Sequence, residues 1–170
     1  ATLLESKIKQ TMVSDVPLGA FLSGGYDSSC VVAFMQKNSV KKIKTFSIGF
    51  DQKIYNEAEH AKEISDILGT EHNELYLSKN DLLDTISSLP SIYSEPFADS
   101  SQIPTVLLSK LTKSQVTVSL SGDGGDELFG GYGKYFLGER IKQSLMPIPS
   151  GLRRGLKNLS LDDVKAMYIK

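Results

Sequence analysis

The sequence predicts an α/β fold, in which helices cover both faces of a three-layer, doubly wound and mainly parallel sheet. Apolar segments of strand length alternate along the chain with segments whose apolar residues recur at helical spacing. Strands separated by helical crossovers pair in parallel, and the crossover helices then cover both faces. Ligands of such sheets bind at the carboxyl ends of the strands, near the point where the strand order reverses.

The predicted elements alternate in order as far as residue 120. The first strand is a buried apolar segment that ends in a turn of small residues, and the last is a β-branched alternating segment. Predicted strands cover residues 16–22, 41–50, 74–77 and 115–120, and predicted helices cover residues 28–37, 57–68, 81–89 and 103–111.

The second of these helices has recognisable start and stop signals. Asn56 is a suitable N-cap, and Glu57 and Glu59 in the first turn suit the helix dipole. Gly69 is expected to end the helix, because glycine readily adopts the left-handed conformation of a C-cap. The predicted apolar face consists of Ala58, Ala61, Ile64, Ile67 and Leu68.

Length and composition indicate one globular domain. The chain has 170 residues, of which 40% are hydrophobic and 23% charged, so it can bury a sizeable core. A net charge of −1 argues against a nucleic-acid partner, whose binding surface is usually basic. The single cysteine excludes an internal disulfide, and neither a membrane span nor a secretory leader is evident. We expect a cytoplasmic protein without a membrane partner; its start at Ala1 suggests a fragment or a processed chain.

The loop after the first predicted strand has the composition of a phosphate-binding site. Its sequence is Ser23-Gly24-Gly25-Tyr26-Asp27-Ser28-Ser29. Glycines let backbone N–H groups converge, serine hydroxyls add donors, and the helix that follows contributes partial positive charge. The Gly-Lys-Ser/Thr ending of a Walker A motif is absent. An ordinary strand-to-helix turn is the alternative interpretation.

A second glycine-rich loop, residues 121–132, follows the last predicted strand and carries Asp123, Asp126 and Glu127. Acidic groups this close together repel one another unless a cation or a set of donors balances them. A Mg²⁺ site built from one or two carboxylates and substrate phosphates meets that need, and a solvated acidic turn is the alternative. If the two strands are neighbours, the two loops face each other across one crevice.

These loops resemble those of a known superfamily. The first is similar to the pyrophosphate loop of the N-type ATP pyrophosphatases, which include asparagine, GMP, NAD, argininosuccinate and tRNA-lysidine synthetases. The second loop is more specific and resembles that of the glutamine-dependent asparagine synthetases. The segment 95–105, Glu-Pro-Phe-Ala-Asp-Ser-Ser-Gln-Ile-Pro-Thr, resembles their bacterial branch. The match in order and spacing extends from about residue 13 to about residue 135.

The resemblance implies that the chain has the fold of the adenine nucleotide alpha-hydrolases and ATP pyrophosphatases, with ATP and Mg²⁺ as ligands. Asp27 and Asp126 would share the metal ion. The residues implied for the β- and γ-phosphates are Ser23, Gly24, Gly25, Ser28 and Ser29. Those implied for the AMP moiety are Leu22, Ile48, Ser121 and Gly122.

The implied reaction is that of an amide ligase. ATP adenylates aspartate to β-aspartyl-AMP with release of pyrophosphate, and ammonia then displaces AMP to give asparagine. Asp123 and Tyr132 are the implied catalytic residues near the acyl group. Many family members carry glutamate where this chain has Asp123, so its reach is one methylene shorter and the acceptor acid stays open. Tyr132 as a packed core aromatic is the alternative.

Residues 1–138 are predicted to form the synthetase core, and residues 139–170 the start of an incomplete C-terminal helical region with a short helix over 161–169. The family's glutaminase half is absent from this sequence, as is a lysine near the α-phosphate that lies further downstream. Cys30, in an apolar helical segment, is expected to pack in the core. The implied partners are aspartate, ammonia and an N-terminal glutaminase domain, with a homodimer as a further expectation. The fragment alone is expected to turn over poorly or not at all.

Two other functions are compatible with the sequence. One is another carboxylate- or tRNA-adenylating N-type ATP pyrophosphatase, although the mild acidity disfavours tRNA. The other is a non-catalytic nucleotide-binding module, although such a module would not need both Asp27 and Asp126. His60 is expected at the surface, and neither His60 nor His72 has metal-binding partners at ligand spacing.

Overall fold

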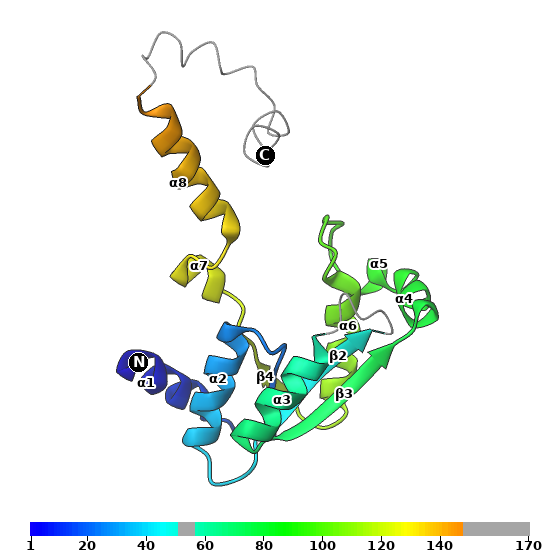
Figure 1. Ribbon diagram of the computed structural model, residues 1–170. Coiled ribbons are helices and arrows are strands. Elements are labelled where there is room, and N and C mark those ends of the chain that lie inside the picture. Colours follow the sequence, from blue (N-terminus) through cyan, green and yellow to red (C-terminus); the bar gives the residue numbers. More distant parts are fainter. Residues whose placement is uncertain (51–56, 148–170) are drawn as a thin grey trace. The chain divides into compact units, whose positions relative to one another are not determined.

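Figure 1 shows the protein as a computed structural model, which describes residues 1–50 and 57–147. The chain divides into two units, Ala1–Asp123 and Gly124–Lys170. The first unit contains the sheet and the helices packed on it. The second contains α7 (Gly125–Phe129) and α8 (Gly133–Leu145). The predicted division after residue 138 falls inside α8 and stays a prediction, and the predicted helix over 161–169 lies outside the described residues.

The sheet of the first unit consists of β1 (Leu18–Phe21), β2 (Lys44–Phe50), β3 (Glu71–Leu77) and β4 (Val118–Leu120). The strand order is β3-β2-β1-β4, and every neighbouring pair is parallel. The chain therefore adds β2 and β3 on one side of β1 and later places β4 on the other side. This confirms the predicted parallel sheet and puts the reversal of strand order between β1 and β4.

Three helices pack with β1 in one hydrophobic core. They are α1 (Thr2–Thr11), α2 (Tyr26–Lys37) and α3 (Ala58–Leu68). The buried members of this core are Ile8, Ala20, Leu22, Val32, Met35, Ile43 and Ala61. The other helices of the unit are α4 (Lys79–Ile86), α5 (Leu89–Ile92) and α6 (Gln102–Lys113), and α6 packs against β2.

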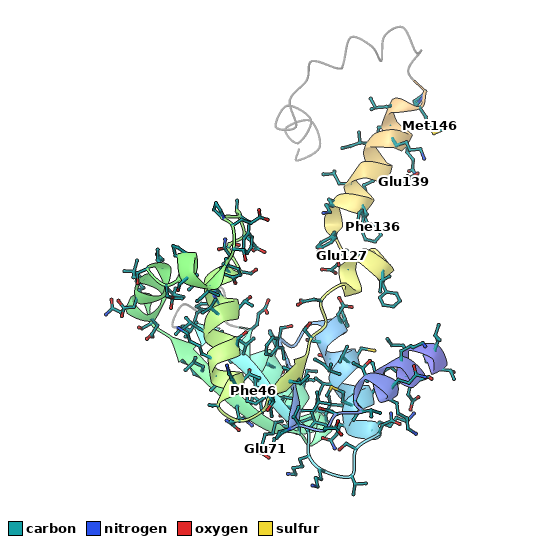
Figure 2. The ribbon with its side chains drawn as sticks, turned by 180° about the vertical axis from the view of Figure 1, so that it is seen from behind. Phe46, Glu71, Glu127, Phe136, Glu139 and Met146 are labelled. Atoms are coloured by element: carbon teal, nitrogen blue, oxygen red, sulfur yellow. The ribbon has the colours of Figure 1, made fainter. Side chains whose placement is uncertain are left out.

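Alternating residues of β2 show that both faces of the sheet are covered. The hydroxyl of Thr45 is hydrogen-bonded to Thr70, which in turn is hydrogen-bonded to Ser65 of α3. The next residue, Phe46 (labelled in Figure 2), is fully buried and lines a pocket together with Leu108 of α6. Because successive side chains of a strand point to opposite faces, α3 and α6 lie on opposite sides of β2. The predicted three-layer arrangement is confirmed.

Helix α3 largely follows its prediction. Gly69 is its C-cap in the left-handed conformation, with φ +71°, and donates its N–H to the carbonyl of Ser65 at 2.8 Å. Asn56 lies outside the described residues, and the helix has its N-cap at Glu57. Ile67 was wrongly placed on the apolar face, since it is 79% exposed. It lies about half a turn away from the buried Ala58 at 100° per residue, and Ser65 is buried in its place.

Other boundaries differ because polar residues find distant partners. β3 begins at Glu71, three residues before the predicted start, and pairs with β2 over its whole length. Its first three residues are polar and look unlike a strand in isolation. Glu71 pairs with Lys44 at 3.7 Å, His72 is hydrogen-bonded to Thr45, and Asn73 accepts from Gln115.

Helices α1, α5 and α7 were not predicted from the sequence, and α8 begins six residues before the helical region that was predicted from residue 139. Of the residues in α1, Ile8 alone is fully buried, so the apolar period is weak. No helix in the described ranges has the length and apolar character needed to cross a bilayer.

Candidate functional site

The two polar loops predicted from the sequence leave neighbouring strands at the same edge of the sheet. β1 and β4 are parallel, with Leu18 opposite Val118 and Ala20 opposite Leu120. The loop that follows β1 and the loop that follows β4 therefore start side by side. The two strands are neighbours, as the predicted crevice requires, and they flank the reversal of strand order where ligands of such sheets bind.

Gly122 brings the second loop against the start of α2. A Cβ atom on Gly122 would lie 2.7 Å from the backbone nitrogen of Ser28 and 3.0 Å from the carbonyl carbon of Asp27. These atoms belong to the backbone and cannot move aside, so the position accepts glycine alone. Two loops nearly a hundred residues apart in the sequence thus touch at Asp27 and Ser28.

The first loop is held by hydrogen bonds among its own residues. The hydroxyls of Ser23 and Ser28 lie 3.0 Å apart, and Ser28 donates to the carbonyl of Gly25 at 3.3 Å. Gly24 has φ +82°, and a Cβ there would lie 2.9 Å from the backbone nitrogen of Ala61 in α3. The loop is therefore fixed in shape by internal bonds and by contact with α3.

The start of α2 has the features of an anion site. Gly25 is the N-cap and offers no side chain, so the first backbone N–H groups of this 12-residue helix receive no side-chain cap. The hydroxyl of Ser29 is buried and has no hydrogen-bond partner among the described residues. A buried donor without a partner is unusual and fits a phosphate ligand. Asp27, half-buried in the first turn, supplies the nearby carboxylate.

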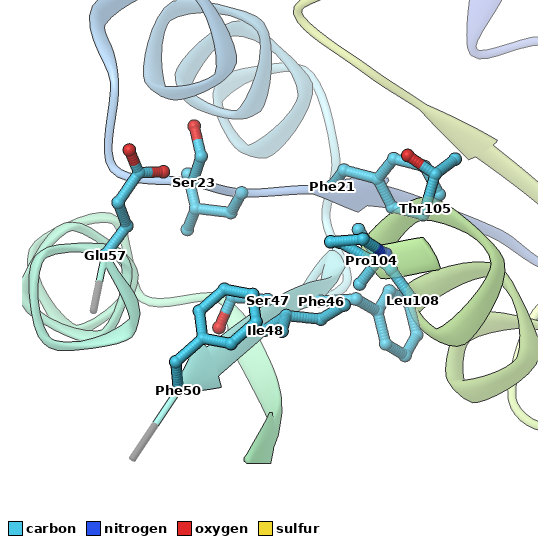
Figure 3. A pocket seen from close by; sticks show the side chains of 11 residues that line it. Phe21, Ser23, Phe46, Ser47, Ile48, Phe50, Glu57, Pro104, Thr105 and Leu108 are labelled. Carbon is cyan, nitrogen blue, oxygen red and sulfur yellow. The ribbon is translucent and has the colours of Figure 1, made fainter. Parts of the chain in front are cut away.

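A pocket of about 200 Å³ lies at the carboxyl ends of β1 and β2 (Figure 3). Its walls include the predicted Leu22 and Ile48, and Ser23 belongs both to the pocket and to the first loop. Pro104 and Thr105, from the end of the segment 95–105, line the pocket as well. The other residues that line it are Phe21, Phe46, Ser47, Phe50, Glu57 and Leu108. A mainly apolar pocket with a few polar groups suits a small ligand with an aromatic part.

The second loop begins in the first unit with Ser121, Gly122 and Asp123. The Asp123 carboxylate accepts a hydrogen bond from the hydroxyl of Ser121 at 3.1 Å, and the Asp123 N–H donates back to the same hydroxyl at 3.4 Å. Asp123 is exposed, so its carboxylate is accessible to solutes.

The second unit carries Asp126, Glu127 and Tyr132. The Tyr132 hydroxyl donates to the Glu127 carboxylate at 2.6 Å, which raises the pKa of Tyr132 to about 12 and lowers the pKa of Glu127. Lys134 Nζ lies 4.2 Å from the centre of the Tyr132 ring. Any side chain on Gly131 would overlap the carboxylate of Asp126, and the Gly131 N–H donates to the Asp126 carbonyl at 3.0 Å. The turn after α7 therefore constrains Asp126.

The part of the chain that the structure describes has no cluster of three or more His, Cys, Asp or Glu side chains that could hold a metal ion. Mg²⁺ nevertheless fits the first loop, because this ion commonly uses one or two carboxylates together with substrate phosphates. Asp27 is the carboxylate of that loop. His60 is exposed, as expected, and Cys30 is only partly buried, so it does not lie in the core.

Sequence reasoning missed three polar groups near the pocket: Ser47, Glu57 and His72. Ser47 and Glu57 line it, and His72 is hydrogen-bonded to Ser47. The available signal was the polar pair Thr45 and Ser47 in the expected strand 41–50, because residues two apart lie on the same face of a strand.

Solved structures share this fold. An NMN synthetase from Francisella tularensis matches with a TM-score of 0.54 and 16% identity, over 77% of this chain and 56% of the other. An NH3-dependent NAD synthetase from Campylobacter jejuni matches with a TM-score of 0.52 and 16% identity, over 78% of this chain and 58% of the other. The α/β fold of these synthetases is therefore the fold of the first unit.

The chain belongs to the asparagine synthase family, whose model matches residues 1–167. It is 41% identical over 152 residues to glutamine-hydrolysing asparagine synthetase 1 of Bacillus subtilis, covering 88% of this chain and 23% of that protein. A protein of Methanocaldococcus jannaschii, provisionally named glutamine-hydrolysing asparagine synthetase 2, is 45% identical, covering 89% of this chain and 29% of that protein. The chain thus spans less than a third of the length of these relatives.

Proposed function

We propose that this chain is the ATP-binding part of a ligase that converts aspartate to asparagine. The observation that carries the proposal is the continuity of the site. Ser23 belongs at once to a serine- and glycine-rich loop at a helix N-terminus and to a mainly apolar pocket. A nucleoside triphosphate has the matching division into an anionic end and an aromatic end. The named relatives, which are asparagine synthetases, supply the substrate class.

The anionic end of ATP is assigned to the first loop. The backbone at Gly24 and Gly25, together with the hydroxyls of Ser23, Ser28 and Ser29, would hold the β- and γ-phosphates. Two observations support this assignment: the buried Ser29 hydroxyl that lacks a partner among the described residues, and the close approach of Gly122 to the Ser28 nitrogen.

The nucleoside end is assigned to the pocket at the ends of β1 and β2. Leu22 and Ile48 would contact the adenine, and Ser121 and Gly122 would contact the AMP moiety through their backbone. Burial of the apolar walls of the pocket against an adenine ring would favour binding.

Mg²⁺ is assigned to Asp27 and Asp126, and its charge would offset the negative charge that builds on the departing pyrophosphate. Half-burial of Asp27 in the first turn of α2 and the constraint of Asp126 by Gly131 support this assignment. The two residues belong to different units of the chain.

The proposed chemistry has two displacements. An oxygen of the aspartate β-carboxylate bonds to the α-phosphorus, and the bond from that phosphorus to the bridging oxygen breaks, so that pyrophosphate leaves. The lone pair of ammonia then attacks the acyl carbon, AMP leaves with its oxygen, and the nitrogen loses a proton. Asp123 is assigned to accept a proton from, or to orient, the attacking amine, and Tyr132 is assigned to the acyl-adenylate.

The ammonia is proposed to come from a glutaminase domain, because the relatives are named glutamine-hydrolysing. No residue of this chain is assigned to that reaction. A cytoplasmic location and a homodimer complete the proposal.

ATP–pyrophosphate exchange, measured on the intact protein with single amino acids, tests the function. Incorporation of labelled pyrophosphate into ATP should require aspartate and Mg²⁺. Exchange with a different acid would instead identify another carboxylate-adenylating enzyme. This outcome is compatible with Asp123, whose side chain is one methylene shorter than the glutamate of many family members. ATP binding without exchange for any acid would identify a nucleotide-binding module.

A further inference from the structure

A buried chain of polar side chains extends from α3 to the wall of the pocket. Ser65 is hydrogen-bonded to Thr70 at 2.8 Å, and Thr70 to Thr45 at 3.1 Å. The imidazole of His72 bridges the next two hydroxyls. Its Nδ1 is hydrogen-bonded to Thr45 at 2.9 Å, and its Nε2 is hydrogen-bonded to Ser47 at 3.1 Å. All five side chains are buried. Ser47, the last member, lines the pocket, whereas His72 does not (Figure 3).

Burial favours the neutral form of the His72 ring. Burial lowers the pKa of His72, and the charge of Lys62 on α3 lowers it further. Two carboxylates raise the pKa of His72 instead: that of Glu74, which lies 3.7 Å from Nε2, and that of Asp66 on α3. The effect of burial is larger, so the net change is a lower pKa. A neutral imidazole has one N–H donor and one bare acceptor nitrogen. Thr45 and Ser47 must therefore play opposite roles, one receiving the ring proton and the other donating to the ring.

This constraint ties the role of the Ser47 hydroxyl, as donor or as acceptor, to the ring nitrogen that carries the proton. If Ser47 accepts from Nε2–H, its own proton is free for a ligand; if Ser47 donates to Nε2, only its lone pairs remain free. The two states reverse the direction of donation along the whole chain of hydroxyls from Ser65 to Thr45, so the tautomer of His72 and the state of Ser47 change together.

We propose that His72 is a positioning residue for the nucleotide: it orients the Ser47 hydroxyl and so fixes the hydrogen-bonding group that the pocket wall presents to the nucleoside. The proposal rests on the proposed function, because it takes this pocket as the nucleoside site. His72 acts only through Ser47 and is not itself in contact with the ligand.

A matched pair of substitutions separates the two ends of the ring. In His72→Gln the side-chain amide lies near the position of Nε2, so Ser47 keeps a hydrogen-bond partner. In His72→Asn the shorter amide lies near the position of Nδ1, so Thr45 keeps a partner and Ser47 loses one. Each variant loses one buried hydrogen bond, so both should lose similar stability. By calorimetric titration of the intact protein with ATP, we expect Kd to rise about three- to tenfold for His72→Asn and less than about twofold for His72→Gln.

Ser47→Ala completes the test as a double-mutant cycle. If His72 acts through Ser47, adding His72→Asn to Ser47→Ala should leave Kd unchanged. Equal weakening by Gln and Asn, or a full effect of His72→Asn in the Ser47→Ala background, would show a merely structural role and overturn the inference. Wild-type protein that binds no ATP would refute the proposed function as well, so the two failures are distinguishable.

Discussion

Gly122 and Ser28 are in backbone contact: the Cα of Gly122 lies so close to the amide of Ser28 that a Cβ would come within 2.7 Å of its nitrogen. This contact joins the loop after β4 to the first turn of α2, and with it the two halves of the candidate site in the first unit. The site is therefore defined by tertiary packing and not by either loop alone.

Substitution of Gly122 by alanine should damage the site directly. The added methyl group meets backbone atoms that cannot rotate away, so the two loops must separate. We expect the Kd for ATP, measured by calorimetric titration, to rise by about tenfold or more. Gly138→Ala is the control, because a Cβ there meets nothing within 4 Å. Wild-type affinity in Gly122→Ala would exclude the contact from the binding site.

Asp27→Ala should weaken the binding of Mg·ATP far more than that of ATP in the presence of a chelator. The carboxylate is assigned to the metal ion, so its loss matters only when the ion is bound. We expect a Kd increase of about tenfold or more with Mg²⁺ and little change without it. Asp66→Ala, which removes an exposed carboxylate that binds Lys62, serves as the control. A loss of affinity that is equal with and without Mg²⁺ would remove Asp27 from the metal site.

Gly69→Ala should destabilise the fold without affecting the nucleotide. Gly69 has φ +71° and open space around its Cα, so the penalty is purely conformational and amounts to about 1 kcal/mol in the free energy of unfolding. Gly69→Asn should cost less, because asparagine adopts this conformation more readily. Urea denaturation measures both values, and the reverse order of the two variants would contradict the explanation.

The stability of the protein should decrease on mild acidification in a way that depends on His72. Its pKa is lowered by burial, so below about pH 6.5 the unfolded chain takes up a proton that the folded protein does not. The free energy of unfolding then falls with pH until the folded pKa is passed. In urea titrations between about pH 8 and 5, the stability advantage of wild type over His72→Gln should shrink as the pH falls. A growing advantage would show that the folded protein prefers the charged ring.

Much of the first unit could be predicted from local sequence signals. Gly69 as the end of α3 follows from its position after an apolar helical face, and the parallel sheet follows from the alternation of strands and helices. Both features depend on residues close together in the sequence. Leu22 and Ile48, which line the pocket, were implied by the family resemblance, and their role at the nucleoside stays a prediction.

The features that the sequence did not predict depend on contacts between distant segments. Glu71, His72 and Asn73 pair with β2 along the backbone, and their side chains are bound by Lys44, Thr45 and Gln115. The polar chain that ends at Ser47 forms only when residues 45–47 of β2 lie beside residues 65–72, so no local sequence motif indicates it. Ile67 was misplaced because five apolar residues were assigned to one face of α3, which is wider than a single stripe allows.

The first loop touches two separate parts of the unit, through Gly24 at α3 and through Asp27 and Ser28 at Gly122. Such bracing means that the loop is preorganised. Little chain entropy is left to lose when an anion enters, so recognition should resemble lock-and-key binding more than induced fit. The same bracing makes the loop intolerant of insertions: a single extra residue would break both contacts at once.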